Sequence, residues 1–320
     1  MQDEDEPTLN ELAWDLVQQS LFAADELRIE LLDEIAGATV IDFGVESIGS
    51  LGAGLALAEV CTAGLAEITL CPGEVGGRGW PHVFVTSDSP LEACLLSQYA
   101  GWRIGTDDYF GMGSGPMRAA AAREDLYDRF DYRESATHVV GVLESGEVPT
   151  EAAVREIAEK CSVETSNIAL LVASTASLAG NLQIVARSVE TALHKLHELR
   201  YDAPNIESSP DCSPSPPFAA DYLTGIGRTN DAILYGARVT LMVHGDDESI
   251  ESLGPQIPST GSTAHGRPFL EIFEQAGQDF YKIDPLLFSP AEVVLHNVET
   301  GRAHCFGEIS PAVLRESFGM

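Results

Sequence analysis

The spacing of hydrophobic positions predicts a chain in which helices and strands alternate. Residues 8–36 show the 3.6-residue helical period from Leu9 onward, with a second apolar stripe that ends at Gly37. Short apolar runs have the length of strands and lie at 38–43, 67–71, 83–86, 138–144 and 167–173. Further helical patterns lie at 55–63, 90–100, 117–129, 150–161 and 180–199. Thr150 is well suited to cap the helix that it precedes.

The pattern changes beyond residue 200. Five prolines fall between Pro204 and Pro217, which predicts an irregular crossing or linker. A strand is expected over 231–244, a short helix over 269–274 and a strand over 280–283. Glycine-rich loops or turns are expected at 44–54, 72–81 and 109–116. The fold class is therefore α+β, with two subdomains over 1–200 and 201–320 whose boundary is open and which can interleave.

Composition narrows the possible functions. The 320 residues are 44% hydrophobic, enough for one large domain or two smaller ones, and no apolar run reaches the roughly 18 to 20 residues of a membrane helix. The net charge of −32 argues against partners such as nucleic acid or an anionic membrane, which need a basic surface. The acidic residues 1–7 differ from the basic start of a signal peptide, so we expect a cytoplasmic protein.

The six cysteines predict neither a zinc site nor a disulfide framework. No two form a C-x-x-C pair, and several lie in apolar segments, so we interpret them as reduced, mostly structural thiols. Asp211-Cys212 in the proline-rich segment is interpreted as a loop thiol in preference to a cysteine nucleophile. No G-x-S-x-G serine-hydrolase motif is present.

Two glycine motifs are candidates for ligand binding. Gly49–Gly54 lies between a strand and a helix but is spaced G-x-x-G-x-G, so a structural turn or substrate-facing loop is favoured over a dinucleotide site. Gly111–Pro116 leads into a helix, whose free N–H groups can bind a carbonyl, a phosphate or a pterin edge. A plain tight turn is the alternative for this second motif.

The helix over 180–199 carries a polar face beside its apolar stripe. Arg187, Glu190, His194 and His197 follow one another at spacings of three, four and three. Three interpretations are open: a solvated face with an ion pair, a metal site of Glu190 and the two histidines, and an acid–base unit of Arg187 and Glu190. The metal set matches no familiar template, because paired helical ligands usually lie four apart.

Two C-terminal segments are rich in polar side chains. Gly225–Asp231 is dense in hydrogen-bonding groups before an apolar run. In Phe280–Pro285, Lys282 and Asp284 would face the same way on a strand. Lys282 is one of only three lysines, although a lysine with a merely structural role is the alternative.

Together these segments resemble the methenyltetrahydromethanopterin cyclohydrolase family from about residue 8 to the end. The stretches that carry the resemblance are Tyr99–Trp102, Gly111–Pro116, Ala186–Lys195, Gly227–Gly236 and Phe280–Glu292. The acidic N-terminus and the scarcity of lysine depart from the family's better-known archaeal members, which concerns the surface and not the site.

The resemblance implies two α+β subdomains with a pterin cleft between them, a homotrimer, and a reaction that opens a cyclic amidinium without metal or organic cofactor. It implies that Arg187 and Glu190 are the catalytic pair. Expected substrate contacts are Ser114, Gly115, Arg228, Thr229, Asp231, Lys282 and Asp284. A metal-dependent amidine hydrolase and a non-catalytic pterin-binding protein are the alternatives.

Overall fold

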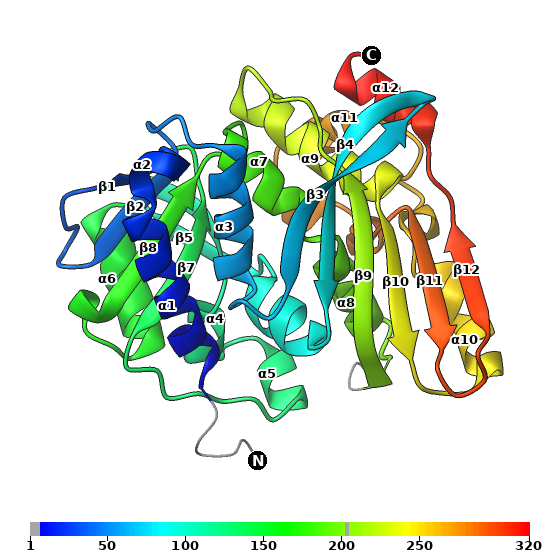
Figure 1. Ribbon diagram of the computed structural model, residues 1–320, viewed down its shortest axis with the longest axis horizontal. Coiled ribbons are helices and arrows are strands. Elements are labelled where there is room, and N and C mark those ends of the chain that lie inside the picture. Colours follow the sequence, from blue (N-terminus) through cyan, green and yellow to red (C-terminus); the bar gives the residue numbers. More distant parts are fainter. Residues whose placement is uncertain (1–6, 202–204) are drawn as a thin grey trace. The chain divides into compact units, whose positions relative to one another are not determined.

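The computed structural model describes residues 7–201 and 205–320, and its contacts divide the chain into two units (Figure 1). Unit 1 comprises Met1–Leu65 and Glu92–Gln183, and unit 2 comprises Ala66–Leu91 and Ile184–Met320. The chain therefore passes between the units three times. Residues 1–6 and Pro204, used in the sequence analysis, lie outside the described residues. Each unit contains helices and one mixed sheet, so the fold class is α+β.

Unit 1 is built on a six-stranded sheet with the order β1-β2-β8-β7-β6-β5. Its strands are β1 (Glu30–Leu31), β2 (Thr39–Gly44), β5 (Trp102–Thr106), β6 (Tyr109–Ser114), β7 (Val139–Glu144) and β8 (Ile168–Ala173). β2, β8 and β7 are parallel, whereas β1, β6 and β5 join as antiparallel neighbours. All six residues of β8 are buried, as expected for the middle of a parallel sheet.

Several of the helices expected in unit 1 are present, and others are divided into two shorter helices. They are α1 (Leu9–Phe22), α2 (Ala24–Leu27), α3 (Leu51–Cys61), the π-helix η1 (Leu91–Gln98), α4 (Met117–Ala121), α5 (Asp125–Arg129), α6 (Glu151–Cys161), the 3₁₀ turn η2 (Thr165–Asn167) and the first part of α7 (Leu178–Val185). Thr150 caps α6 as predicted, its hydroxyl accepting from the Ala153 N–H at 3.4 Å. Val154 and Ile157 point into the core.

Unit 2 has a second six-stranded sheet with the order β12-β11-β10-β9-β4-β3. Its strands are β3 (Glu67–Val75), β4 (Arg78–Ser87), β9 (Ile206–Pro214), β10 (Arg238–Val243), β11 (Glu292–Asn297) and β12 (Ala303–Gly307). β10 and β11 are parallel, and the other neighbours are antiparallel. The alternation of buried and half-exposed residues along β10 and β11 shows that one face is covered and the other is not.

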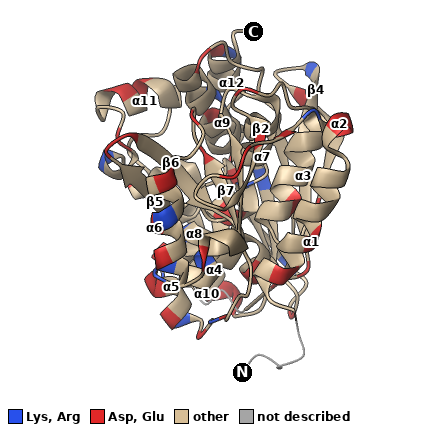
Figure 2. Ribbon diagram, turned by 90° about the vertical axis from the view of Figure 1, so that its left-hand side faces the viewer, with Lys and Arg blue, Asp and Glu red and all other residues tan. Residues whose placement is uncertain are grey.

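The remaining helices belong to unit 2. They are α8 (Ser188–Glu198), α9 (Tyr222–Gly236), α10 (Asp247–Leu253), α11 (Phe269–Gln275), α12 (Pro311–Phe318) and the 3₁₀ turns η4 (Gly254–Gln256), η5 (Ser259–Gly261), η6 (Phe280–Lys282) and η7 (Pro285–Leu287). α8 and α9 both pack against β9. Acidic residues lie on helices of both units, for example on α1 and α2 of unit 1 and on α11 of unit 2 (Figure 2).

The prediction of one continuous helix over 180–199 is wrong. α7 ends at Val185 and α8 begins at Ser188, with Arg187 as the residue that precedes the new helix. The apolar stripe of Leu182, Val185 and Val189 runs on through the break, and for this reason periodicity did not reveal it.

The proline-rich segment is also not a linker. Residues 206–214 form β9, a central strand that lies between β4 and β10. Prolines are unusual inside a sheet because they lack the N–H that a ladder needs. β10 pairs with Ser208 on one side of Pro210 and with Asp211 on the other, so the ladder is interrupted there.

Several other segments have a different secondary structure from the one expected. The strand expected from Asp231 is the second half of α9, and only Arg238–Val243 is extended. The strand expected over 280–283 is the 3₁₀ turn η6, so Lys282 and Asp284 do not share a strand face. The loop expected over 72–81 is the β3–β4 hairpin, and most of the turn expected over 109–116 is β6. The helices expected over 8–36 and 117–129 are each divided, and the first is followed by β1.

Within the described residues, no helix is both long enough and apolar enough to cross a membrane.

The cap of α6 gives a test of the fold. We expect Thr150→Ala to lower the free energy of unfolding by about 1 kcal/mol, because the Ala153 N–H loses its acceptor. Urea denaturation of the two proteins measures the difference. Thr150→Ser retains the hydroxyl and is the control, and equal losses in both variants would contradict the capping role.

Candidate active site

The predicted catalytic pair lies where α7 gives way to α8. Arg187 precedes α8 with φ −94° and ψ 10°, its N–H bound to the Ile184 carbonyl at 3.1 Å and its carbonyl to the Thr191 N–H at 2.9 Å. Glu190 lies in the first turn of α8, and both side chains are only 4% exposed. The positive end of a helix dipole favours a carboxylate there. The structure therefore places a buried arginine and a buried glutamate at the start of one helix.

The start of α8 is attached to the sheet through Ser188. Its hydroxyl donates to the Val185 carbonyl at 3.1 Å, and it lies 2.5 Å from the hydroxyl of Ser213 on β9. Both serines are fully buried. The turn that carries Arg187 is thus connected to the end of α7 and to a central strand.

A lysine missed by the sequence analysis connects α8 to the segment that contains Asp284. Lys195 is 1% exposed, and its ammonium group donates to the Leu286 carbonyl. Burial lowers the pKa of Lys195 to about 8, while the nearby Asp284 carboxylate acts in the opposite direction. Asp284 accepts from the Ser262 hydroxyl at 2.6 Å and from the Leu286 N–H at 3.0 Å. The scarcity of lysine in the chain was the signal that singled out Lys282 and applies equally to Lys195.

Lys282 has a different environment from Lys195. Its side chain is 67% exposed and forms an ion pair with Asp279 at 3.3 Å within η6. A long exposed cation of this kind remains able to reach a bound anion or carbonyl. Its contact with substrate stays a prediction.

Three expected substrate contacts lie on α9 and make bonds inside unit 2. The Thr229 hydroxyl, fully buried, donates to the Gly225 carbonyl at 2.9 Å. The Arg228 guanidinium donates to the carbonyls of Phe218 at 2.9 Å and Ser317 at 3.1 Å. The Thr229 bond lies within α9, and the Arg228 bonds join α9 to segments near Phe218 and Ser317. Contact of Arg228, Thr229 and Asp231 with a substrate stays a prediction.

Asp231, the third of these residues, is 1% exposed and accepts from the Phe269 N–H at 2.7 Å. Burial raises the pKa of Asp231 to about 7, although hydrogen bonds from Ser317 and Phe269 act in the opposite direction. The bond to Phe269 fixes the beginning of α11. Asp231 is thus a buried acid whose protonation changes near neutral pH.

The other two expected contacts, Ser114 and Gly115, lie together at the end of β6 in unit 1. The Ser114 hydroxyl is 3.4 Å from the Cys61 thiol, and Gly115 adopts φ +85°, where glycine is favoured. The Gly115 N–H donates to the Ser97 carbonyl at 2.9 Å, so this amide is not one of the free groups that the sequence suggested. Arg118, fully buried, also donates to the Ser97 carbonyl, at 3.2 Å.

The metal interpretation of the α8 face finds no support in the geometry. Among the described residues, no group of three or more His, Cys, Asp or Glu is close enough to hold a metal ion. His194 lies 3.9 Å from Glu198, and the side chain of His197 is buried. Glu190, His194 and His197 therefore do not form the cluster of ligands that the metal interpretation requires.

The other candidates from the sequence have structural settings. A Cβ atom at Gly54 would lie 2.8 Å from the Leu182 Cβ, so this glycine permits close packing of α3 on α7, as the structural interpretation of Gly49–Gly54 requires.

Cys212 lies on β9 and not in a loop, and burial raises the pKa of its thiol to about 12, which disfavours a nucleophilic thiolate. All six cysteines are described, and none forms a disulfide.

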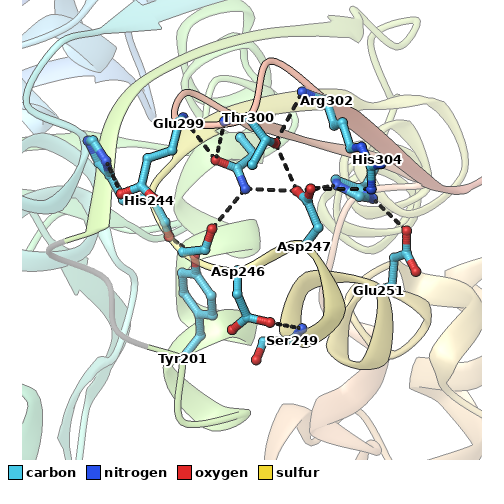
Figure 3. Close-up of polar contacts among 12 residues, drawn as sticks. Tyr201, His244, Asp246, Asp247, Ser249, Glu251, Glu299, Thr300, Arg302 and His304 are labelled. Carbon is cyan, nitrogen blue, oxygen red and sulfur yellow. Dashed lines mark hydrogen bonds and ion pairs between the residues drawn. The ribbon is translucent and has the colours of Figure 1, made fainter.

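A dense polar network lies on other elements of unit 2 and joins α10 to the β11–β12 turn (Figure 3). Asp247 accepts from Asn297 at 2.8 Å, from Thr300 at 3.0 Å and from His304 at 3.0 Å. His244 bridges Glu207 and Glu299, whose hydrogen bonds raise the pKa of the imidazole. The partners in this network satisfy one another, which is typical of a structural connection.

The buried carboxyl of Asp231 predicts a pH dependence of stability. The folded state holds a proton that the unfolded chain releases near pH 4, so the free energy of unfolding falls as pH rises from about 4 to about 7. The Asp231→Asn variant lacks this contribution. The quantity to follow is the difference between the free energies of unfolding of wild type and variant. We expect this difference to fall by up to about 1.4 kcal/mol per pH unit and to level off above about pH 7. Urea denaturation across this range measures it, and parallel pH profiles would show the prediction wrong.

Comparison with known proteins agrees with the resemblance seen in the sequence. The family model described as "Cyclohydrolase (MCH)" matches residues 8–318. A protein of Rhodopirellula baltica named methenyltetrahydromethanopterin cyclohydrolase is 46% identical over 291 residues, covering 89% of this chain and 87% of the relative. Proteins with the same name from Methylobacillus flagellatus (98% of this chain, 96% of the relative) and Methanococcoides burtonii (98% of each) are 41% and 39% identical. The chain therefore belongs to the MCH cyclohydrolase family.

Proposed function

We propose that this protein hydrolyses the cyclic amidinium of 5,10-methenyltetrahydromethanopterin to 5-formyltetrahydromethanopterin, reversibly, in one-carbon metabolism. Two observations support this reaction. The family model matches almost the whole chain, and the relatives that carry the cyclohydrolase name align with it over 87 to 98% of their own length. The observation that carries the proposal for the site is the burial of Arg187 and Glu190 together at the start of α8.

The chemistry requires a water molecule to attack a carbon held between two nitrogens. Water is a weak nucleophile, and a positioned general base contributes a factor of roughly 10² to 10⁴. The Glu190 carboxylate takes one water proton as the C–O bond forms. The adduct then collapses to a formyl group, one C–N bond breaks, and protonated Glu190 gives its proton to the departing nitrogen. The second water proton is released to solvent, which balances the loss of the amidinium charge.

Arg187 has a positioning and an electrostatic part in this scheme. A guanidinium close to Glu190 favours the ionised carboxylate, and so does the N-terminal end of α8. It also offers donors to the oxygen that is added to the substrate carbon. Its charge repels the cationic substrate whereas Glu190 attracts it, so the pair presents little net charge to the amidinium.

The substrate carbon is already an electrophile, and we therefore propose that the reaction needs no metal and no organic cofactor. Tetrahydromethanopterin enters as the carrier of the carbon and leaves with the product. A metal-dependent hydrolase and a non-catalytic pterin-binding protein are the competing functions. The substrate contacts proposed for Ser114, Gly115, Arg228, Thr229, Asp231, Lys282 and Asp284 rest on the family resemblance.

The activity itself is directly measurable. We expect purified protein to remove the amidinium absorbance of methenyltetrahydromethanopterin, and to act much less efficiently on methenyltetrahydrofolate. Chelator treatment should leave the rate unchanged. Binding without turnover would favour the pterin-binding alternative, and loss of activity on chelation with recovery on adding zinc would favour the metal alternative.

The roles of the pair predict a set of variants. We expect Glu190→Gln, which keeps size but removes the base, to lower kcat by at least about 10². Arg187→Gln should also lower kcat, and the double variant should cost less free energy than the sum because the two residues act as one unit. Circular dichroism checks that each variant is folded.

His194→Ala and His197→Ala are the matched controls from the same helix. Both should retain most of the turnover, since neither takes part in the proposed proton transfer. Near wild-type turnover in Glu190→Gln would contradict the acid–base role. Abolished activity in the histidine variants would instead support the metal alternative.

We also propose that the uncovered face of the unit 2 sheet is where copies of this chain meet in a homotrimer. In the central strands this face is largely uncharged, and two of its charged residues, Arg238 and Glu292, pair at 3.3 Å. The outward residues of β4, β9, β10 and β11 include His82, Phe84, Thr86, Ser208, Pro210, Cys212, Arg238, Thr240, Met242, Glu292, Val294 and His296. The centres of protein interfaces are poor in charged residues. This face is likewise poor in charge, although the chain as a whole carries 50 acidic residues. A second copy of the chain therefore suits this face.

Light scattering tests the assembly. We expect a trimer at micromolar concentration, more stable in high salt because ions screen the repulsion between subunits of charge −32. Met242→Arg should favour the monomer, because it places a cation in the middle of the face. Phe22→Arg, at a site 96% exposed on α1, is the control and should remain trimeric. A wild-type monomer, or a trimer unaffected by Met242→Arg, would contradict the assignment.

A further inference from the structure

Two cysteines on the outer face of the unit 2 sheet face each other across a strand. Cys71 lies on β3 and Cys212 on β9, and β4 separates these two strands. Their Sγ atoms are 4.0 Å apart. Cys71 is opposite His82, and Cys212 is opposite Phe84. The side chain of the intervening Val83 is buried on the other face, so the two thiols meet over the outer side of its backbone.

This arrangement differs from that of the buried thiols in unit 1. The thiols of Cys61 and Cys161 lie 3.9 and 3.5 Å from backbone carbonyl oxygens, which is typical of structural cysteines. Cys71 and Cys212 are only half-buried, and the hydrogen-bonding partner of each is the other thiol. Their sulfur atoms are therefore within reach of a small ion from solvent.

The position of the two strands does not suit a disulfide. Sulfur atoms in a disulfide are about 2.05 Å apart, and the Cα atoms are at most about 7 Å apart. Neighbouring strands are about 4.8 Å apart, so two such spacings place the Cα atoms of Cys71 and Cys212 roughly 9 to 10 Å apart. Oxidation to a disulfide would have to pull β3 and β9 together over β4.

A bridging metal ion suits the same spacing. Zinc binds thiolate sulfur at about 2.3 Å, so an ion of this kind spans sulfur atoms up to about 4.6 Å apart. The observed 4.0 Å lies within that reach without movement of the strands. Zinc itself requires four ligands, and among the described residues no group of three or more His, Cys, Asp or Glu could hold a metal ion. Soft monovalent ions such as Cu(I) prefer thiolates and are stable with two ligands.

The charges around the pair permit a cation to bind. Arg238 is opposite Cys212 on β10, and its ion pair with Glu292 at 3.3 Å offsets its charge. Burial and Arg238 lower the pKa of His82, so this imidazole is neutral at pH 7 and does not repel a cation. The net charge of −32 attracts cations to the protein as a whole.

We propose that Cys71 and Cys212 together bind one soft monovalent cation of the class of Cu(I) and Ag(I). Two Cys–SH groups and one such ion give a dithiolate complex of charge −1 and release two protons. The ion links β3 to β9 across β4. It lies on the face of β9 opposite Ser213, which contacts α8, and it takes no part in the proposed hydrolysis.

Titration with Ag(I), followed by native mass spectrometry in chloride-free buffer, tests the site. We expect one ion per chain in wild type. Cys71→Ser and Cys212→Ser should each weaken binding by at least about 10², because two linked ligands bind roughly 10² to 10⁴ more tightly than one. Cys305→Ser, which removes an exposed thiol from β12 of the same sheet, is the control and should bind as wild type does.

The titration also identifies results that would overturn the proposal. Tight binding that persists in both Cys71→Ser and Cys212→Ser, or that is lost in Cys305→Ser, would place the ion elsewhere. Zn(II) bound more tightly than Ag(I), and lost in the same two variants, would overturn the choice of a monovalent ion. A Cys71–Cys212 disulfide formed readily with hydrogen peroxide would overturn the argument from strand spacing.

Two measurements on the same protein show whether the ion joins the strands. Ag(I) should raise the Tm of wild type and of Cys305→Ser, and leave the Tm of the other two variants nearly unchanged, because only a bound ion stabilises the folded state. In wild type, Ag(I) should protect Cys71 and Cys212 together from iodoacetamide and leave Cys305 reactive, as peptide mapping shows. If the serine variants fail to fold, this labelling decides, and reaction of either thiol in the presence of Ag(I) would overturn the proposal.

The proposed homotrimer provides a further comparison, because Cys212 lies on the face assigned to assembly. The Met242→Arg variant, expected to be monomeric, leaves that face open. Binding of Ag(I) in Met242→Arg but not in the wild-type trimer would support the site and show that assembly covers it. A lack of binding in both proteins would overturn the proposal.

Discussion

Two side chains of charged type, Arg187 and Glu190, are almost completely buried at the start of one helix, and the catalytic role proposed for them depends on how that helix is held. A charge removed from water is costly unless dipoles or opposite charges compensate for it. The break between α7 and α8 supplies one compensation, because it creates a new helix N-terminus beside Glu190. A continuous helix would have placed the same residues at mid-length, where no free N–H groups point toward a carboxylate.

The helix that bears this pair is attached near both ends. Near its start, Ser188 meets Ser213 of β9, and toward its end Lys195 donates to the carbonyl of Leu286. Both attachments are buried polar contacts, which fix geometry more strictly than apolar packing because they require direction as well as proximity. General-base catalysis depends on such directional control, since the base has to lie within hydrogen-bonding reach of the water that it activates.

Several elements could be predicted from the sequence, and others could not. Thr150 identified the beginning of α6, and the apolar run at 167–173 identified β8, because local capping and local hydrophobicity determine these elements. The prolines of 204–217 suggested a linker, yet Pro210 and Pro214 lie in β9, where neighbouring strands outweigh local preference. Asp231 was expected on a strand because its apolar neighbours fit either period, and it lies on α9.

The sequence by itself determined the α+β class and the family, since both depend on the order and identity of residues along the chain. It also drew attention to Arg187 and Glu190, which are three apart in a recognisable stretch. Only the tertiary structure decided that these two lie at a helix start, that Lys195 and Asp284 are neighbours, and that Ser188 of α8 meets Ser213 of β9. These relations join segments that are from about 20 to 90 residues apart. They depend on how strands and helices pack, and the spacing of residues within one segment carries no information about that packing.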